Sequence, residues 1–262
     1  VKDTKDAQSY MQRLMPLVKT PLFWVLCLLS GSLYGTRTLF LLYSNNFLAA
    51  SYCFEAHPND RPESKAYRGC LTDERTSSVT AAASSIYTLL GCVSVLLVGV
   101  LKDKLPEKHR AATLVLFIIL LLCTMVFLGT SGTHIPFPVA VAAVAFTGFC
   151  LFGPYKVLGA VFAVDVGGKR LKSTCTAFMG VFDNMFAIFM LQAKGVIGED
   201  WILMFASVAG LCVMSVFCSS FVWVWDLRKA RVSAREPIEA SLLGESDASQ
   251  RRNAFNENRD RP

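Results

Sequence analysis

The sequence predicts an all-α membrane protein with six transmembrane helices. Hydrophobic residues make up 53% of the chain and charged residues only 18%, below the roughly 25% charged of an average soluble domain. The mean hydropathy is +0.43. The charges are segregated, so that long uncharged runs alternate with short charged segments. The six expected spans cover about 22–49, 77–101, 111–130, 137–165, 173–197 and 202–225.

These runs predict helices because a bilayer is crossed by roughly 20 apolar residues in α-helical form, and lipid accepts only helices or closed barrels. The connections predict the orientation. Segments 102–110, 167–172 and 226–235 hold four, three and four Lys or Arg, whereas 130–135 and 198–200 hold none. Cytoplasmic connections are enriched in Lys and Arg. We therefore expect both ends of the chain in the cytoplasm.

The two flanks are polar. Residues 1–20 are interpreted as a cytoplasmic linker, and residues 227–262 lack the apolar residues of a packed core, which predicts a disordered cytoplasmic tail. The chain begins at Val1 without a signal peptide, and we expect it to be the C-terminal part of a longer protein. No basic stripe is interleaved with aromatic residues, so the net charge of +6 does not indicate a nucleic-acid partner.

Two of the nine cysteines lie outside the apolar runs. Cys53 and Cys70 flank the loop on the side opposite the basic connections, and an oxidising environment there favours a disulfide between them. The loop also contains His57, Asp60 and Glu63, but not at metal-ligand spacing, so no metal site is predicted.

Arg37 lies in the first apolar run, where a charged side chain costs several kcal/mol on some scales. Tyr34, Arg37, Thr38, Leu41 and Asn45 share one helix face. A polar stripe on a spanning helix normally faces a bundle interior or a watery cavity, which favours a binding or transport role. The alternative is a structural ion pair between helices.

The fourth run contains Gly153-Pro154, and proline removes a backbone donor, so a break near mid-depth is expected. Lys156 follows, about 15 Å inside the cytoplasmic end at about 1.5 Å per residue. Asp165 lies at that end. Lys156 is therefore a second cation within the membrane.

The fifth run contains Asp183-Asn184 near its middle. Asp183 is interpreted as a counter-ion of Lys156 or Arg37, or as a proton carrier. Two cations and one anion leave excess positive charge, and arginine grips phosphate or carboxylate with two hydrogen bonds. The residues thus predict that the protein binds a small anionic solute, but they do not distinguish a phosphate from a carboxylate. No catalytic motif is present, and neither an enzyme nor a cofactor is expected.

The segment GVLKDKLPEKHR, residues 99–110, resembles the loop signature of the major facilitator superfamily. It has Gly99, then Asp103 four residues later, Lys104 beside it, and further basic residues up to Arg110. In that superfamily the loop joins the second and third helices of a six-helix half. Here it lies between the second and third predicted spans.

The segment LYGTRTLFLLYSNNFL, residues 33–48, resembles the seventh helix of the organophosphate:phosphate antiporters, which include glycerol-3-phosphate and sugar-phosphate exchangers. The segments FGPYKVLGAVFAVDVGGKRLKSTCTAFMGVF and RAATLVLFIILL resemble their tenth-to-eleventh helix region and the start of their ninth helix. The resemblance assigns Arg37 to the substrate phosphate with Tyr34 beside it. Lys156 and Asp183 match no signature of that family.

This resemblance implies the C-terminal half of a twelve-helix transporter that works by alternating access. The N-terminal half would supply a second arginine, and an organic phosphate would exchange for inorganic phosphate. Gly99, Asp103, Lys104, Arg110 and Asp165 would gate the cytoplasmic side. We therefore assign the substrate site to Arg37, Tyr34, Lys156, Asn45, Asp183 and Asn184.

Two alternatives remain. One is a major facilitator with a carboxylate or amino-acid substrate, which explains Arg37 equally well. The other is a non-transporting membrane protein, whose polar residues pair between helices and whose loop or tail binds partners.

Overall fold

The fold of the chain was analysed in a computed structural model. It describes residues 15, 18–56, 64–105, 107–132, 135–197 and 200–259. These residues form seven α-helices and one π-helical segment, namely α2 (Pro21–Ala56), α3 (Lys65–Thr72), α4 (Glu74–Lys104), α5 (Glu107–Ser131), α6 (Phe137–Val157), η2 (Leu158–Phe162), α7 (Ala163–Ile197) and α8 (Trp201–Arg259). The described part contains no strand, which confirms the all-α prediction.

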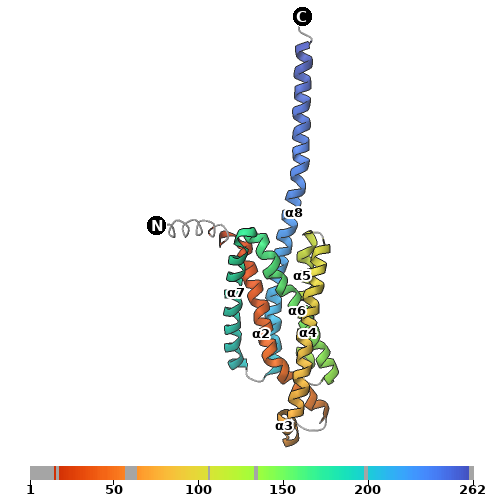
Figure 1. Ribbon diagram of the computed structural model, residues 1–262, viewed down its shortest axis with the longest axis vertical. Coiled ribbons are helices and arrows are strands. Elements are labelled where there is room, and N and C mark those ends of the chain that lie inside the picture. The colour runs from red at the N-terminus through yellow and green to blue at the C-terminus, as the bar shows by residue number, and fades with distance from the viewer. Residues whose placement is uncertain are drawn as a thin grey trace, which may run out of the picture.

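Six of these helices, all except α3, are long and apolar enough to cross a membrane, as judged over the described ranges. This confirms the predicted number of spans. Figure 1 shows a bundle in which α3 lies at one end and α8 projects from the other. The junction between α4 and α5, which carries the basic segment 102–110, lies at the end from which α8 projects.

Helix α2 is the central element, because it packs against α4, α6, α7 and α8. Its buried face repeats every seven residues, with Leu26, Leu33, Phe40 and Phe47 all at most 2% exposed. A seven-residue spacing keeps side chains on one face of a helix. At 36 residues α2 is about 54 Å long, so it extends beyond a hydrocarbon core of about 30 Å.

Glycines allow α4 and α6 to approach closely. A Cβ atom at Gly148 would overlap the backbone carbonyl of Tyr87, and one at Gly153 would lie 2.5 Å from the Oγ of Ser94. Small residues at helix interfaces permit this approach in membranes, where van der Waals packing drives association.

The predicted break at Gly153-Pro154 is displaced in the structure. Pro154 lies inside α6, which continues to Val157 before the backbone changes to the π-helix η2. Proline cannot donate a hydrogen bond to the carbonyl four residues earlier, yet the helix continues past it for three residues. Gly153 lacks a side chain where α6 packs closely against Ser94 of α4. The basic segment 167–172 lies within α7 rather than in a loop, so the predicted span 137–165 is divided among α6, η2 and the start of α7.

The last helix is longer than predicted. Helix α8 continues to Arg259, where the sequence analysis predicted a disordered tail from residue 227. This part of α8 projects from the bundle (Figure 1). Most of the predicted linker 1–20 lies outside the described residues.

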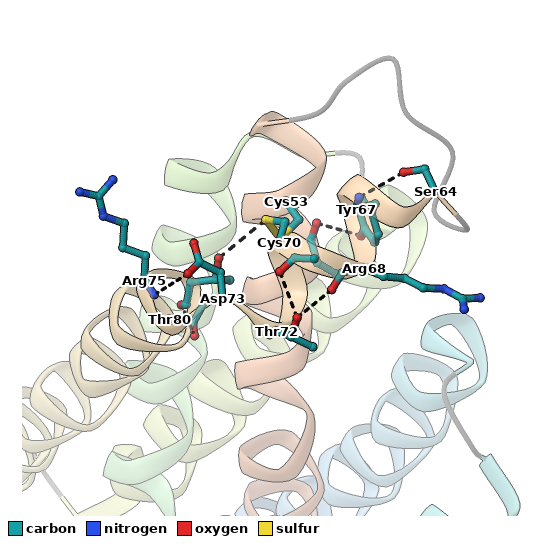
Figure 2. The surroundings of a disulfide bond; sticks show 12 residues. Cys53, Ser64, Tyr67, Arg68, Cys70, Thr72, Asp73, Arg75 and Thr80 are labelled. Atoms are coloured by element: carbon teal, nitrogen blue, oxygen red, sulfur yellow. Dashed lines mark hydrogen bonds between the residues drawn. A yellow bond between two sulfur atoms is a disulfide. The ribbon is translucent and has the colours of Figure 1, made fainter.

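The predicted disulfide is present in the structure. Cys53, near the end of α2, is bonded to Cys70 on α3, as Figure 2 shows. The hydroxyl of Ser64 accepts a hydrogen bond from the backbone N–H of Tyr67, which caps α3. The Tyr67 hydroxyl donates to the carbonyl of Ala50 at 3.2 Å, and burial raises the pKa of this phenol. Helix α3 is thus held against α2 by a covalent bond and a hydrogen bond.

The loop predicted to lack a metal site lies only partly within the described residues. His57, Asp60 and Glu63 fall outside them. In the part of the chain that was searched, no group of three His, Cys, Asp or Glu side chains is arranged to hold a metal ion.

Substituting Gly148 with alanine should destabilise the bundle, because the added methyl group meets the backbone of α4, which cannot move aside as a flexible side chain would. Overpacking of this kind costs about 1–3 kcal/mol. The measurement is the melting temperature and the folded yield in detergent. Gly210→Ala on α8 is the matched control, because no atom lies within 4 Å of its added Cβ. Equal effects of the two substitutions would contradict the close α4–α6 contact.

Reduction of the Cys53–Cys70 bond should lower thermal stability, because the bond closes a loop of 17 residues and closure of such a loop contributes about 3 kcal/mol. Cys53→Ser should melt at the same temperature as the reduced protein. Cys123→Ser removes an exposed free thiol and should behave as the unsubstituted chain. If thiol labelling of the denatured, unreduced protein modifies all nine cysteines, the disulfide is absent.

Candidate functional site

Arg37 lies on α2 where α4 and α6 pack against it. Its guanidinium carbon is 4.9 Å from the centre of the Phe152 ring and 5.8 Å from that of Tyr34. A cation over an aromatic face is attracted by the ring quadrupole. No ion pair to Arg37 is found in the described ranges, and its buried Nε atom has no hydrogen-bond partner there. The charge is therefore cradled by aromatic rings without a protein anion.

Asp183 on α7 is satisfied differently. Its side chain is 8% exposed. The Ser30 hydroxyl of α2 donates to Oδ1 at 2.7 Å, and the Tyr155 hydroxyl of α6 donates to Oδ2 at 3.0 Å. One carboxylate thus joins three helices. Hydrogen bonds to an ionised acceptor are stronger than those between neutral groups. The Asp183 carboxylate therefore holds α2, α6 and α7 together, and we call this set of hydrogen bonds the tie.

Lys156 adjoins this carboxylate. Its Nζ lies 5.3 Å from the centre of the Tyr155 ring, and no ion pair between Lys156 and Asp183 is found among the described residues. Asp183 is 12 residues into the span Leu171–Gly195, about 18 Å along its axis. The end of α6 therefore lies level with the middle of the α7 span.

Aromatic contacts link the arginine to the carboxylate. The rings of Tyr34 and Tyr155 have centres 5.7 Å apart, and Tyr155 binds Asp183. Tyr34, Arg37, Lys156 and Asp183 are thus brought into one cluster, as the sequence analysis expected. Asp183 forms no ion pair with Lys156 or Arg37, the two counter-ions considered, within the described residues; its oxygens accept hydrogen bonds from two hydroxyl groups instead.

The other two predicted site residues lie apart from this cluster. Asn45 is eight residues beyond Arg37 on α2, about 12 Å along the axis, and lines a separate cavity. Asn184 is exposed, and its Nδ2 donates to the carbonyl of Gly180 one turn earlier in the same helix at 2.8 Å. That bond turns its amide along α7 rather than toward Arg37.

The predicted gating residues are only partly described. Gly99 is half-buried in α4, with open space where a Cβ would lie, and Lys104 is exposed at the end of that helix. The side chains of Asp103, Arg110 and Asp165 lie outside the described residues. A gating role for these five residues stays a prediction.

Sequence reasoning missed four residues of the cluster, namely Ser30, Tyr87, Phe152 and Tyr155. Tyr87 on α4 is 1% exposed, packs edge-on against Phe152 and carries a hydroxyl without a hydrogen-bond partner among the described residues. A lone tyrosine in an apolar run is a weak signal, and only the packing of α4 on α6 brings it near Arg37.

The cluster suits an anion. A guanidinium that lacks a protein counter-ion can bind an oxyanion through two parallel hydrogen bonds. The nearby Tyr34 and Tyr87 hydroxyls can donate to such a ligand, and the phenyl ring of Phe152 keeps water from one face of the guanidinium. Asp183 is already bonded and leaves the positive charge of Arg37 uncompensated.

The chain is similar to a probable hexose phosphate transport protein of Chlamydia pneumoniae. The two are 26% identical over 142 residues, which are 54% of this chain and 31% of that protein. The chain thus aligns with about a third of the length of this relative. No family model matches the chain. Together with the six apolar helices, this similarity indicates a multi-pass membrane protein.

Removing the Tyr155 hydroxyl should loosen the contact between α6 and α7. Tyr155→Phe leaves one oxygen of a buried carboxylate without its donor, which costs about 1–3 kcal/mol. A double-mutant cycle with Asp183→Asn, followed by thermal unfolding, measures the coupling. Tyr52→Phe is the control, because the hydroxyl of Tyr52 makes no hydrogen bond within the described part of the chain and its ring packs on Phe137. Additive effects of Tyr155→Phe and Asp183→Asn would contradict the tie.

Proposed function

We propose that the chain is the C-terminal six-helix half of a major-facilitator-type transporter for an organic phosphate, with a sugar phosphate as the favoured substrate. The organic phosphate exchanges for inorganic phosphate by alternating access of a central site. The N-terminal half of the full protein supplies the opposing six helices and a second cation. Both ends of the half lie in the cytoplasm, and α3 lies on the opposite side.

The observation that carries the proposal is the uncompensated charge of Arg37. An arginine inside an apolar bundle is costly, and a purely structural arginine would be expected to hold an acidic partner. Arg37 has aromatic neighbours and no ion pair in the described part of the chain. A substrate oxyanion would supply the missing negative charge. When the substrate leaves, the arginine would again be without a counter-ion, and this difference in free energy would couple substrate binding to the conformational change.

Two further facts support a phosphate as the anion. The similarity to a probable hexose phosphate transport protein covers 54% of the chain, and residues 33–48 resemble the phosphate-binding helix of organophosphate antiporters. A carboxylate or amino-acid substrate would satisfy the same guanidinium. A non-transporting protein would explain the three-helix tie at Asp183 but would leave the charge of Arg37 without a purpose.

The function is tested with the full-length protein in liposomes loaded with radiolabelled inorganic phosphate. Hexose 6-phosphate, glycerol phosphate and simple carboxylates are added outside in turn, and phosphate efflux is followed. We expect organic phosphates alone to release phosphate. Efflux with carboxylates would assign the site to the other anion class, and the absence of any efflux would refute the exchange.

Arg37→Lys should abolish most of this exchange while leaving the folded yield unchanged. Lysine keeps the charge but loses the planar fork that makes two parallel hydrogen bonds, and loss of a charge-assisted bond lowers activity about tenfold or more. Exchange rates and size-exclusion profiles are measured together. Arg75→Lys, at an exposed arginine near the start of α4, is the matched control. A parallel loss of folded Arg37→Lys protein would mark the arginine as structural.

A further inference from the structure

A cavity lies at the end of the bundle that carries the disulfide. It has a volume of about 230 Å³, is open on one side and is lined by residues of α2, α3 and α4. Its lining consists of Asn45, Asn46 and Ala49 of α2, Leu71 of α3, and Thr76, Ser77, Thr80 and Ala81 of α4. Every one of these described lining side chains is uncharged.

The lining carries unused hydrogen-bonding groups. The amides of Asn45 and Asn46 are exposed and make no hydrogen bond with the described residues. Each amide offers two donors and an acceptor. The buried Thr80 hydroxyl donates to the carbonyl of Thr76 at 2.8 Å, and its oxygen remains an acceptor. The cavity therefore presents paired donors and acceptors without net charge.

This chemistry matches a polyhydroxyl compound. Each hydroxyl of a sugar is both donor and acceptor, and amides and hydroxyls are its natural partners. Leu71, Ala49 and Ala81 add apolar surface for the C–H faces of a sugar ring. The volume of about 230 Å³ is below the roughly 300–1,000 Å³ of drug-sized pockets. It is suited to a molecule of one ring.

The cavity is separate from the Arg37 cluster. Asn45 lies about 12 Å beyond Arg37 along α2, toward α3. Arg37 itself points the other way, because its guanidinium lies over the ring of Tyr34, which precedes it by one turn, as side chains on helices incline toward the N-terminus. A single sugar phosphate cannot have its phosphate at Arg37 and its sugar among these amides at once.

The disulfide fixes the shape of this cavity. Leu71 directly follows Cys70, which is bonded to Cys53 of α2, and the Cys70 sulfur lies 3.7 Å from the Thr76 hydroxyl in the cavity wall. Figure 2 shows the disulfide beside the start of α4. Helix α3 is therefore held in place as one wall, and the amides of α2 face a preformed space.

We propose that this cavity is an outer binding site for the neutral, polyhydroxyl part of a sugar phosphate, occupied before or after the phosphate is held at Arg37. The inference rests on the proposed function for its place in transport, but sugar binding itself does not require transport. The site selects for the sugar and not for the phosphate, so inorganic phosphate passes without engaging it.

Saturation-transfer NMR tests the site directly, with D-glucose as a phosphate-free probe and the full-length protein in detergent. We expect transfer to the ring protons of glucose. Loss of both amides in Asn45→Ala/Asn46→Ala should weaken glucose binding about tenfold, since several hydrogen bonds are lost. Arg37→Gln should leave the glucose signal unchanged. The control Thr130→Ala/Ser207→Ala removes two exposed hydroxyls that bond only to their own helices and should also leave it unchanged.

Transport kinetics provide the second readout. In liposomes, Asn45→Ala/Asn46→Ala should raise the KM for hexose 6-phosphate about tenfold, while exchange of inorganic phosphate for itself stays at the rate of the unsubstituted protein. The proposal of an outer site is refuted if the glucose signal persists in Asn45→Ala/Asn46→Ala, or if it disappears in Arg37→Gln. It is also refuted if the protein exchanges phosphate but gives no glucose signal at all. Glucose binding to a protein that exchanges no phosphate would instead refute the proposed function and leave the outer site standing.

Discussion

The cost of holding a guanidinium inside an apolar bundle governs the arrangement of the helices around α2. Water is not available there to solvate the charge, so the protein must surround it with polarisable or polar groups. Phe152 and Tyr34 lie against the guanidinium, and Tyr87 lies close behind Phe152. The close approach of α4 to α6, which Gly148 and Gly153 permit, is what brings these rings from three helices to one place.

Asp183 and Arg37 divide the roles of polar groups within the bundle. The carboxylate accepts hydrogen bonds from hydroxyls of two other helices, so it ties α2, α6 and α7 together. The arginine makes no such bonds in the described part of the chain.

Two regions of the bundle differ in how the backbone is held. At the end beyond Asn45, a disulfide and the Tyr67 hydrogen bond fix α3 against α2. Level with the middle of α7, α6 changes to π-helical winding, and the chain runs on into α7 without a loop. Single π-helical turns are rare and occur often at functional sites.

The sequence by itself determined the class of the protein, because apolar runs of about 20 residues and the distribution of Lys and Arg are local properties of the chain. It also indicated Arg37, since a charge in an apolar run stands out, and the Cys53–Cys70 pair, since both flank one polar loop. It misplaced the interruption near Pro154, and it predicted a disordered tail where α8 continues. It did not reveal the partners of Asp183. Ser30 is 153 residues away, and only the packing of α2 on α7 decides that this hydroxyl, and not Arg37, meets the carboxylate.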